Sequence, residues 1–275
     1  MRASDARQKW LYWLADPRSN PDEVTAQPEK ELDSLVVVGS SAGGIEALVT
    51  LIAALPSDFP APLVLAQHLD PRHRSHLAEI LGRHSLLPVR TISNNEPLQP
   101  GVVYVVPADH HVEITDRVVR LRDQHGKGPK PSIDLLLSTA AAAFGERLIA
   151  VILTGSGSDG ASGAHAVKAA GGTVVIENPA TAAYPAMPAS LASATVDIVA
   201  DLERIGPLLS HLLAGTTIPV GLSTTAPLQA LLDQVRDRHG IDFTRYKQPT
   251  IERRLQRRLV ATGLSDVNEY LRYLQ

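Results

Sequence analysis

Ser41 lies in the turn Gly-Ser-Ser-Ala-Gly-Gly at residues 39–44, between a short apolar run and the start of a helical pattern. A tight strand-to-helix turn exposes one side chain at the carboxyl edge of a sheet, and the free N–H groups of the helix start point toward it. A serine in this position could act as a nucleophile while neighbouring amides hold an oxyanion. Taken alone, the turn also fits a nucleotide-binding site or a purely structural role.

The nucleotide-binding interpretation fits the residues poorly. A dinucleotide-binding turn has glycines spaced as G-x-G-x-x-G, whereas here they are spaced as G-x-x-x-G-G. The next strand of such a fold should end in an acidic residue that binds the ribose, but here it ends in Gln67 and His68. A phosphate-binding loop requires Gly-Lys followed by Ser or Thr, and this turn has no such continuation.

His68 and Asp159 favour the hydrolase interpretation. His68 follows the second apolar run, and Asp159 lies in the glycine-rich turn at residues 155–160 that follows a later run. The carboxyl ends of parallel strands meet at one edge of a sheet, so Ser41, His68 and Asp159 should lie there together. A histidine can move the serine proton, and an acid can fix the histidine tautomer. A structural histidine and a helix-capping aspartate are the alternatives, but three matching groups at three strand ends favour a catalytic triad.

A further loop, at residues 180–188, should lie at the same edge of the sheet. Its Tyr184 and Met187 could line a shallow substrate groove, or the loop could merely pack. Metal chemistry finds little support, because His110 and His111 are adjacent and would point to opposite faces of a strand. No two histidines have the four-residue spacing of the H-E-x-x-H metal site. We therefore expect neither a metal nor another cofactor.

The elements that must position these residues follow an alternating pattern. Ala- and Leu-rich helical stretches separate apolar runs at residues 35–38, 63–66, 102–106, 148–153, 173–176 and 196–199. Continuous apolar strands separated by helices predict a doubly wound, mostly parallel α/β sheet with helices on both faces. Residues 101–106 and 112–121 straddle Ala108-Asp109-His110, which predicts a hairpin or an edge insertion there. The catalytic domain should span residues 34–215.

Composition limits the class of protein. The chain has 275 residues, of which 44% are hydrophobic and 20% charged, as in ordinary globular proteins. No apolar run approaches the roughly 20 residues that span a bilayer, and the N-terminus lacks the apolar segment of a secretory signal. The absence of cysteine excludes disulfides and thiol nucleophiles. We expect a cytoplasmic protein without membrane insertion, and the sequence does not predict its oligomeric state.

Three further segments differ from this body. Residues 1–33 are polar and without lasting periodicity, which predicts a flexible leader or a segment that docks a partner. Residues 216–226 are small and turn-prone and predict a linker. Residues 227–275 show three helical patterns, with Ile251, Leu255 and Leu259 facing a small core. Nine basic and six acidic residues give residues 226–275 a net charge of +3, which leaves −6 for the rest of a chain with a total of −3.

Residues 34–215 resemble the catalytic domain of the bacterial chemotaxis receptor methylesterases. The motifs that carry the resemblance are VVVGSSAGGIEAL at 36–48, AQHLDP at 66–71, PGVVYVVPADHH at 100–111, PSIDLLL at 131–137, VILTGSGSDGASG at 151–163 and YPAMP at 184–188. The resemblance implies Ser41 as nucleophile, His68 as base and Asp159 as acid. It also implies that the backbone N–H groups of Ala42 and Ser156 hold the oxyanion. The implied reaction is hydrolysis of glutamate methyl esters on cytoplasmic helices of chemoreceptors, with deamidation of specific glutamines as a second activity.

The chain departs from the well-known enzymes in two respects. They carry Met where this chain has Ser156, and because the contribution expected there is a backbone N–H, the change should be tolerated. They also carry an N-terminal phospho-receiver domain, for which the 33 residues before the catalytic domain are far too few. We therefore do not expect regulation by aspartyl phosphorylation within this chain.

Residues 239–259, HGIDFTRYKQPTIERRLQRRL, resemble the N-terminal helical domain of the chemotaxis receptor methyltransferases. The resemblance favours receptor docking, rather than nucleic-acid binding or a merely solvated face, for the basic residues Arg253, Arg254, Arg257 and Arg258. The last helical pattern reaches the final residue without a stop signal. We therefore expect the front part of a methylesterase–methyltransferase fusion, without methyltransferase activity from this chain alone.

Two alternatives to an esterase stay open on the sequence. One is a non-catalytic scaffold that binds receptor or kinase helices, and it conflicts with an intact set of triad residues. The other is a nucleotide-binding oxidoreductase, and it conflicts with the missing ribose-binding acid.

Overall fold

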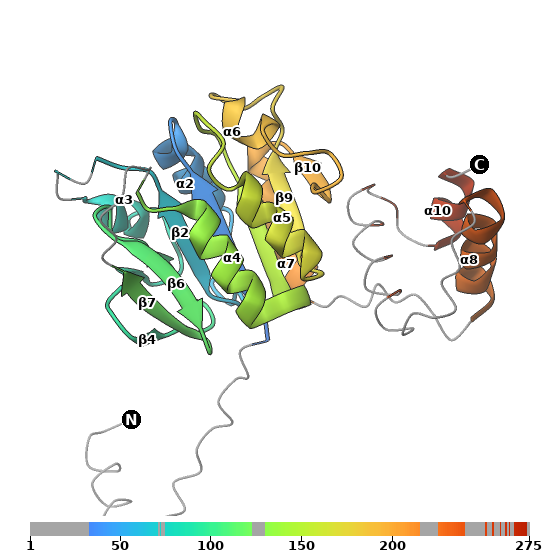
Figure 1. Cartoon of the computed structure of the whole chain (residues 1–275), viewed down its shortest axis with the longest axis horizontal. Helices are drawn as coiled ribbons and strands as arrows, with labels where there is room; N and C mark the ends of the chain where they lie inside the picture. The colour runs from blue at the N-terminus through green and yellow to red at the C-terminus, as the bar shows by residue number, and fades with distance from the viewer. Residues whose placement is uncertain are drawn as a thin grey trace, which may run out of the picture. The chain divides into compact units, whose positions relative to one another are not determined.

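The computed structural model describes residues 33–70, 72, 75–122, 130–214, 225–239, 251, 255, 259, 262, 264 and 267–273 (Figure 1). The predicted leader lies outside the described residues except for Asp33, and so does the predicted linker except for residues 225 and 226. No helix in the described ranges is long and apolar enough to cross a membrane.

A seven-stranded sheet forms the centre of residues 35–213, in the order β10-β9-β8-β1-β2-β5-β3. Every pair of neighbouring strands in it is parallel. The strands are β1 (Leu35–Ser40), β2 (Leu63–Gln67), β3 (Val89–Thr91), β5 (Val103–Val105), β8 (Leu148–Ile152), β9 (Thr173–Glu177) and β10 (Ile198–Ala200). Each of the six predicted apolar runs coincides with a strand, which confirms the doubly wound fold.

Helices cover both faces of this sheet (Figure 1). One face carries α4 (Ile133–Phe144) and α5 (Ala161–Ala169), and the other carries α2 (Gly44–Ala53), α3 (Leu77–Gly82) and α7 (Leu202–Leu213). Alternate residues of β1 supply both layers, because Val37 packs on the α4 side whereas Val36 and Val38 pack on the α2 side. A strand buried on both faces needs an uninterrupted apolar sequence, which explains why these runs do not alternate.

The antiparallel hairpin lies later in the chain than the sequence predicted. Its arms are β6 (His111–Thr115) and β7 (Val118–Arg122), and β4 (Glu96–Pro97) pairs with β7 to complete a three-stranded sheet. Asp116 and Arg117 form the turn, with φ values of 48° and 65°. The region around residues 98–122 thus contains a hairpin, as predicted, but its turn does not lie at Ala108-Asp109-His110. The position was wrong because no glycine marks the left-handed positions of the true turn.

The edge strand β3 was not predicted from the sequence. It has only three residues, and Arg90 and Thr91 in it are exposed. A short edge strand needs no apolar run, since charged side chains are usual there. Its sequence is therefore hard to distinguish from that of a loop.

The C-terminal residues have a small core of their own. Helices α8 (Thr225–His239) and α10 (Val267–Tyr273) flank the helical residues Ile251, Leu255 and Leu259. The buried residues of this core are Leu228, Leu231, Leu255, Leu259 and Val267. The predicted core face of the middle helical pattern is therefore confirmed. The basic residues predicted beside it, Arg253, Arg254, Arg257 and Arg258, lie outside the described residues.

Gly163 allows α4 and α5 to approach closely, because an added Cβ would lie 2.7 Å from Leu137 Cβ and 2.9 Å from the Asp134 carbonyl oxygen. We expect Gly163→Ala to lower the free energy of unfolding by about 1–3 kcal/mol through overpacking. Urea unfolding followed by circular dichroism measures this change. Ser162→Ala is the control, since Ser162 is exposed on the same helix. Equal stability of the two variants would contradict the close packing.

Candidate active site

His68 and Asp159 lie within hydrogen-bond distance although 91 residues separate them in the chain. His68 Nε2 is 2.9 Å from Asp159 Oδ2, and the two side chains are 14% and 11% exposed. His68 directly follows β2, and Asp159 lies in the loop between β8 and α5. Because β1 lies between β2 and β8 in the sheet, the Ser41 turn that follows β1 lies at the same edge between them.

The start of α4 holds Asp159 in place. The backbone N–H of Ile133 donates to Asp159 Oδ2 at 2.8 Å, and that of Asp134 donates to Oδ1 at 3.0 Å. At the start of α5, Asp134 Oδ1 accepts from the backbone N–H groups of Gly160 and Gly163 at 2.9 and 2.7 Å. Each carboxylate thus satisfies N–H groups that the first turn of the other helix leaves unpaired. The sequence interpretation did not single out Asp134, whose only signal was its place in the PSIDLLL motif.

Burial and hydrogen bonding oppose each other at these two carboxyl groups. Burial raises the pKa of Asp159, but the hydrogen bonds from His68 and from the start of α4 outweigh it, so the pKa lies below its ordinary value. Burial also raises the pKa of Asp134, and the nearby Asp159 adds to this, so the N–H groups it accepts do not restore the ordinary value. Asp159 therefore carries the charge that would stabilise an imidazolium.

The turn that carries Ser41 is held by backbone hydrogen bonds. Ser41 N–H donates to the Thr154 carbonyl oxygen at 3.0 Å, and the Ser41 carbonyl oxygen accepts from Gly44 N–H at 2.9 Å. Gly43 ends the turn with φ 71°, in the left-handed region where glycine has no steric penalty. The nucleophile candidate therefore lies on a backbone whose direction is fixed on both sides.

The His68 ring leaves one nitrogen for the serine. Nε2 faces the Asp159 carboxylate, which can only accept, so the neutral ring has its proton on Nε2 and leaves Nδ1 as an acceptor. Within the described residues, no hydrogen bond joins the Ser41 hydroxyl to this ring. Catalytic hydrogen bonds are often long until substrate binds, so Nδ1 is the atom expected to take the Ser41 proton.

Gln67 joins the Ser41 turn to the strand that ends at His68, and its side chain is only 3% exposed. Ser40 Oγ donates to Gln67 Oε1 at 2.7 Å, while Gln67 Nε2 donates to the carbonyl oxygens of Ser41 and His68 at 2.7 and 2.9 Å. An added Cβ at Gly44 would lie 2.0 Å from Gln67 Oε1, so the glycine makes room for this side chain. The sequence interpretation missed this role, although an amide at the end of a buried strand must find partners.

Thr154 connects three loops around the turn. Its N–H donates to Glu177 Oε2 at 2.7 Å, and its hydroxyl donates to the Ala42 carbonyl oxygen at 3.1 Å and accepts from Tyr184 N–H at 2.8 Å. Burial raises the pKa of Glu177, and the hydrogen bond from Thr154 does not restore the ordinary value. These contacts were not predicted either, because spacing along the chain does not reveal side-chain directions.

Tyr184 and Met187, predicted to line a substrate groove, take different positions. Tyr184 is 48% exposed, and an added Cβ at Gly43 would lie 3.0 Å from its ring, so the ring lies against the Ser41 turn. Met187, in α6 (Ala186–Ala189), is completely buried and packs against Gly155. The Met187 side chain offers no surface to a substrate, which corrects that prediction. The sequence could not distinguish the two positions, because an apolar residue can line a groove or pack in the core.

The N–H groups of Ala42 and Ser156, expected to hold the oxyanion, flank Ser41 from two loops. Neither donates a hydrogen bond to another residue in the described part of the structure. An added Cβ at Gly155, the residue before Ser156, would lie 2.8 Å from Ser41 Cβ, so the two loops meet at the candidate nucleophile. Two unpaired donors beside a serine fit an oxyanion site.

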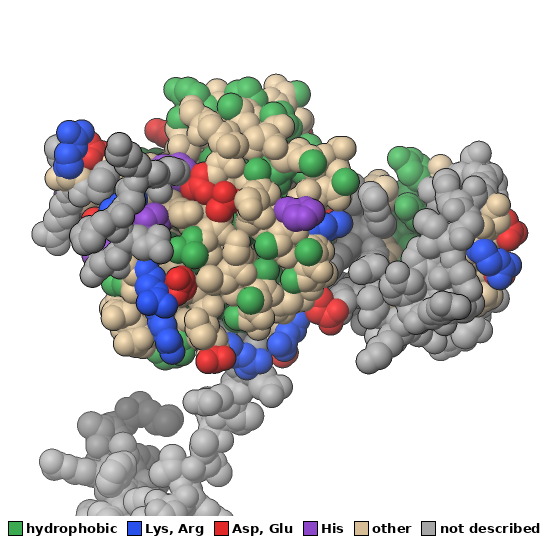
Figure 2. All heavy atoms as spheres, viewed as in Figure 1, with side chains coloured by type: hydrophobic (Ala, Val, Ile, Leu, Met, Phe, Trp, Pro, Cys, Tyr) green, Lys and Arg blue, Asp and Glu red, His purple; other side chains and the backbone are tan. Residues whose placement is uncertain are grey.

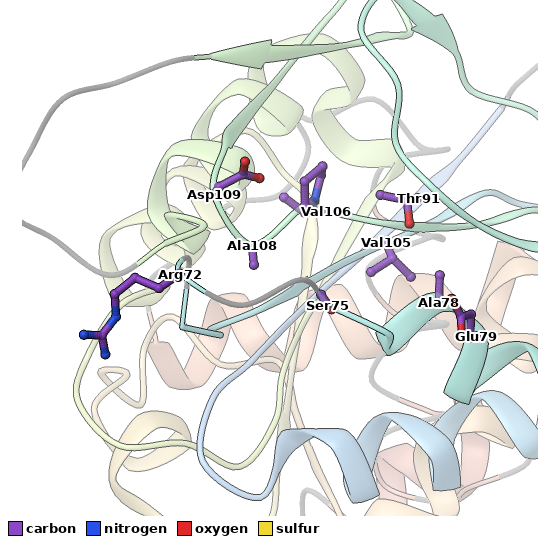
Figure 3. A pocket seen from close by; sticks show the side chains of 10 residues that line it. Arg72, Ser75, Ala78, Glu79, Thr91, Val105, Val106, Ala108 and Asp109 are labelled. Atoms are coloured by element: carbon purple, nitrogen blue, oxygen red, sulfur yellow. The ribbon is translucent and has the colours of Figure 1, made fainter.

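A cavity of about 570 Å³ lies at the same edge of the sheet (Figure 3). It is lined by Arg72, Ser75, Ala78, Glu79, Thr91, Val105, Val106, Pro107, Ala108 and Asp109. Strands β3 and β5 end here, and β5 pairs with β2, the strand that precedes His68. The candidate triad does not line the cavity, which therefore flanks the site rather than containing it. Arg72 points away from the other labelled side chains (Figure 3) and pairs with Asp70.

No group of histidine and acidic side chains among the described residues has the arrangement of a metal site. His111 is 7% exposed and accepts from Ser132 N–H at 3.0 Å, whereas His110 lies 2.7 Å from Asp109. Burial and the nearby charge of Lys130 lower the pKa of His111. Figure 2 shows histidine and acidic side chains lying close together near the N-terminal end of α4.

The fold and the site define a class of α/β protein in which a serine, a histidine and an aspartate follow neighbouring strands at one edge of a parallel sheet, as in serine hydrolases. The chain belongs to the CheB methylesterase family, which it matches over residues 36–209. Residues 226–275 match the all-alpha domain of CheR methyltransferases. Both resemblances predicted from the sequence are therefore confirmed.

Individual relatives agree with this assignment. A putative protein-glutamate methylesterase/protein-glutamine glutaminase of Leptospira interrogans is 37% identical over 180 residues, covering 64% of this chain and 93% of the relative. The protein-glutamate methylesterase/protein-glutamine glutaminase 2 of Caulobacter vibrioides is 35% identical over 213 residues, covering 71% of this chain but only 59% of the relative. The crystal structure of the Thermotoga maritima CheB methylesterase catalytic domain is 36% identical, with a TM-score of 0.62, and the match covers 66% of this chain and 98% of that one.

The raised pKa of Asp134 predicts how stability depends on pH. An acid whose pKa is higher in the folded than in the unfolded state weakens the fold as the pH rises above its ordinary pKa of about 3.9. Asp134→Asn removes this effect and keeps an oxygen that can accept from Gly160 and Gly163. We therefore expect the stability of the variant, relative to wild type, to increase from about pH 4 to about pH 7.

Urea unfolding of both proteins across this pH range measures the difference. Asp134→Ala is the control for the lost acceptor, since it removes the oxygen as well as the charge and should be less stable than Asp134→Asn throughout. A relative stability of Asp134→Asn that stays flat or falls with rising pH would contradict the raised pKa.

Proposed function

We propose that this chain is a protein-glutamate methylesterase that hydrolyses γ-methyl esters of glutamate side chains on chemoreceptors. The observation that carries the proposal is the 2.9 Å contact between His68 Nε2 and Asp159 Oδ2, at the sheet edge where the Ser41 turn lies. The family of the chain and the names of its relatives support the choice of substrate.

The first half of the reaction forms an ester on Ser41. Ser41 Oγ attacks the carbonyl carbon of the substrate ester while His68 Nδ1 takes the hydroxyl proton. Asp159 stabilises the imidazolium, and the N–H groups of Ala42 and Ser156 donate to the oxyanion of the tetrahedral intermediate. His68 then gives its proton to the leaving oxygen, so methanol departs and a glutamyl ester of Ser41 remains.

The second half releases the product. A water molecule gives a proton to His68 and attacks the glutamyl ester, and His68 then returns the proton to Ser41 Oγ as the free glutamate side chain leaves. A glutamine side chain could enter the same cycle, with ammonia in place of methanol. The names of the relatives support this glutaminase reaction as a second activity.

Physical observations weigh against both alternatives to an esterase. A non-catalytic scaffold gives no reason for a nearly buried histidine that pairs with an aspartate of lowered pKa, since burying such groups is costly. A nucleotide-binding oxidoreductase would need a ribose-binding acid at the end of β2. Gln67 stands there instead, and its amide is occupied by backbone carbonyl groups.

Ser41→Ala tests the proposal directly. Removing the nucleophile should lower kcat by about 10⁴-fold or more, measured as methanol release from a peptide carrying one glutamate γ-methyl ester. A fluorophosphonate probe should label the wild-type chain and not the variant. Ser162→Ala is the matched control, because Ser162 is exposed on α5 and has no proposed role in the reaction, and its kcat should stay near that of wild type. Near-wild-type turnover by Ser41→Ala would refute the triad.

We also propose that residues 226–275 dock the esterase on acidic receptor helices, which their net charge of +3 and their match to the CheR all-alpha domain support. Replacing Arg253, Arg254, Arg257 and Arg258 together by Gln should raise KM for a methylated receptor fragment by about 3- to 10-fold, through the loss of electrostatic attraction. The KM for a short methyl-ester peptide is the internal control and should not change. Equal KM shifts for both substrates would count against docking by this segment.

A further inference from the structure

Two peptide bonds beside Ser41 are fixed by hydrogen bonds to their carbonyl oxygens. The Ser41 carbonyl oxygen accepts from Gln67 Nε2 at 2.7 Å and from Gly44 N–H at 2.9 Å. The Gly155 carbonyl oxygen accepts from Met187 N–H at 2.9 Å. Each of these carbonyl groups belongs to the same peptide unit as one of the two unpaired N–H groups described above.

The hydrogen bonds that the two carbonyl oxygens accept fix the directions of the two N–H groups. A trans peptide unit is planar, and its C=O and N–H point in opposite directions. When the Ser41 carbonyl is held toward the Gln67 amide, the Ala42 N–H must point the other way, out of the sheet edge. A hydrogen bond accepted at the oxygen also polarises the whole peptide unit, which makes its N–H a stronger donor.

Gln67 donates to the Ser41 carbonyl oxygen through its side chain, whereas the other donors to these two carbonyl oxygens are backbone N–H groups. Ser40 Oγ donates to Gln67 Oε1 at 2.7 Å, and this bond sets which end of the amide group faces the turn. The NH₂ end then donates to Ser41 and also to the His68 carbonyl oxygen at 2.9 Å. With 3% exposure, the side chain is out of reach of a substrate, so any role in the reaction must act through the residues it holds.

We propose that Gln67 is a positioning residue of the oxyanion site, which orients and polarises the peptide unit between Ser41 and Ala42 so that the Ala42 N–H donates to the oxyanion. The inference rests on the proposed esterase function. The hydrogen bond from the Ala42 N–H becomes stronger when negative charge develops on the substrate oxygen. It therefore stabilises the transition state more than it stabilises bound substrate.

Gln67→Met tests this role. Met has nearly the same length and volume but no N–H donor. With the methyl-ester peptide as substrate, kcat should fall by about 10- to 100-fold while KM stays within about twofold. A poorly oriented oxyanion donor should lower kcat less than the complete loss of that donor would. The pH at which kcat/KM falls on the acid side should not move, because the contact between His68 and Asp159 is untouched.

Two further variants keep the test decisive. Ser40→Ala leaves the Gln67 amide in place but frees it to turn, so kcat should fall less, by about 2- to 10-fold, again with KM unchanged. This variant decides the question if Gln67→Met does not fold. Thr139→Val removes a side-chain hydrogen bond to Ile114 N–H away from the site, and it should lose stability with kcat unchanged.

The outcomes separate the inference from the proposed function. If Ser41→Ala is inactive while Gln67→Met and Ser40→Ala turn over like wild type, the role of Gln67 is refuted and the esterase stands. If Gln67→Met moves the acid-side pH dependence together with kcat, the residue acts through His68 and the inference is also wrong. A fall in kcat at constant KM and constant pH dependence supports it.

Discussion

The exchange of backbone hydrogen bonds between α4 and α5 is the interaction on which the candidate site depends. Asp159 accepts the first N–H groups of α4, and Asp134 accepts those of α5. The first turn of any helix leaves such groups unpaired, and each carboxylate accepts N–H groups at the start of the other helix, so the two helices start side by side. Burial raises the pKa of Asp159, but the hydrogen bonds from His68 and from the start of α4 outweigh it, so the acid beside His68 keeps its charge.

The opposite side of the site is an extension of the sheet itself. Past the last paired residues of the strands, His68 N–H donates to the Ser40 carbonyl oxygen and Ser41 N–H donates to that of Thr154, both at 3.0 Å. The parallel ladder therefore continues into the turn, and the candidate nucleophile and base are placed by the same bonds that hold β1 between β2 and β8. The Gln67 side chain adds a hydrogen bond across this extension, from its Nε2 to the Ser41 carbonyl oxygen.

The sequence predicted Ser41, His68 and Asp159 because a simple rule applies to them: each follows an apolar run, and parallel strands end at one edge. No comparable rule predicts the roles of Gln67 and Asp134 from the sequence. Their roles depend on where a side chain points across the interior, and the one-dimensional pattern contains only their distance from a strand. Apolar residues are ambiguous in the same way. Met187 was predicted at the surface of a groove and is buried, because apolar character does not tell which side of a loop faces the core.

The direction of the His68 ring follows from the order of the strands. The Ser41 turn follows β1, which is adjacent to β2, whereas Asp159 follows β8, one strand further away. Neighbouring strands are about 4.8 Å apart, so the strand that precedes Asp159 lies one strand spacing further from β2 than the strand that precedes Ser41. Nδ1 is the ring nitrogen nearer to the backbone, and Nε2 is the more distant one. The far nitrogen therefore reaches the far strand, as the contact of Nε2 with Asp159 shows, and the near nitrogen is left for Ser41. A sheet in which the serine strand lies between the other two accommodates the triad in this orientation.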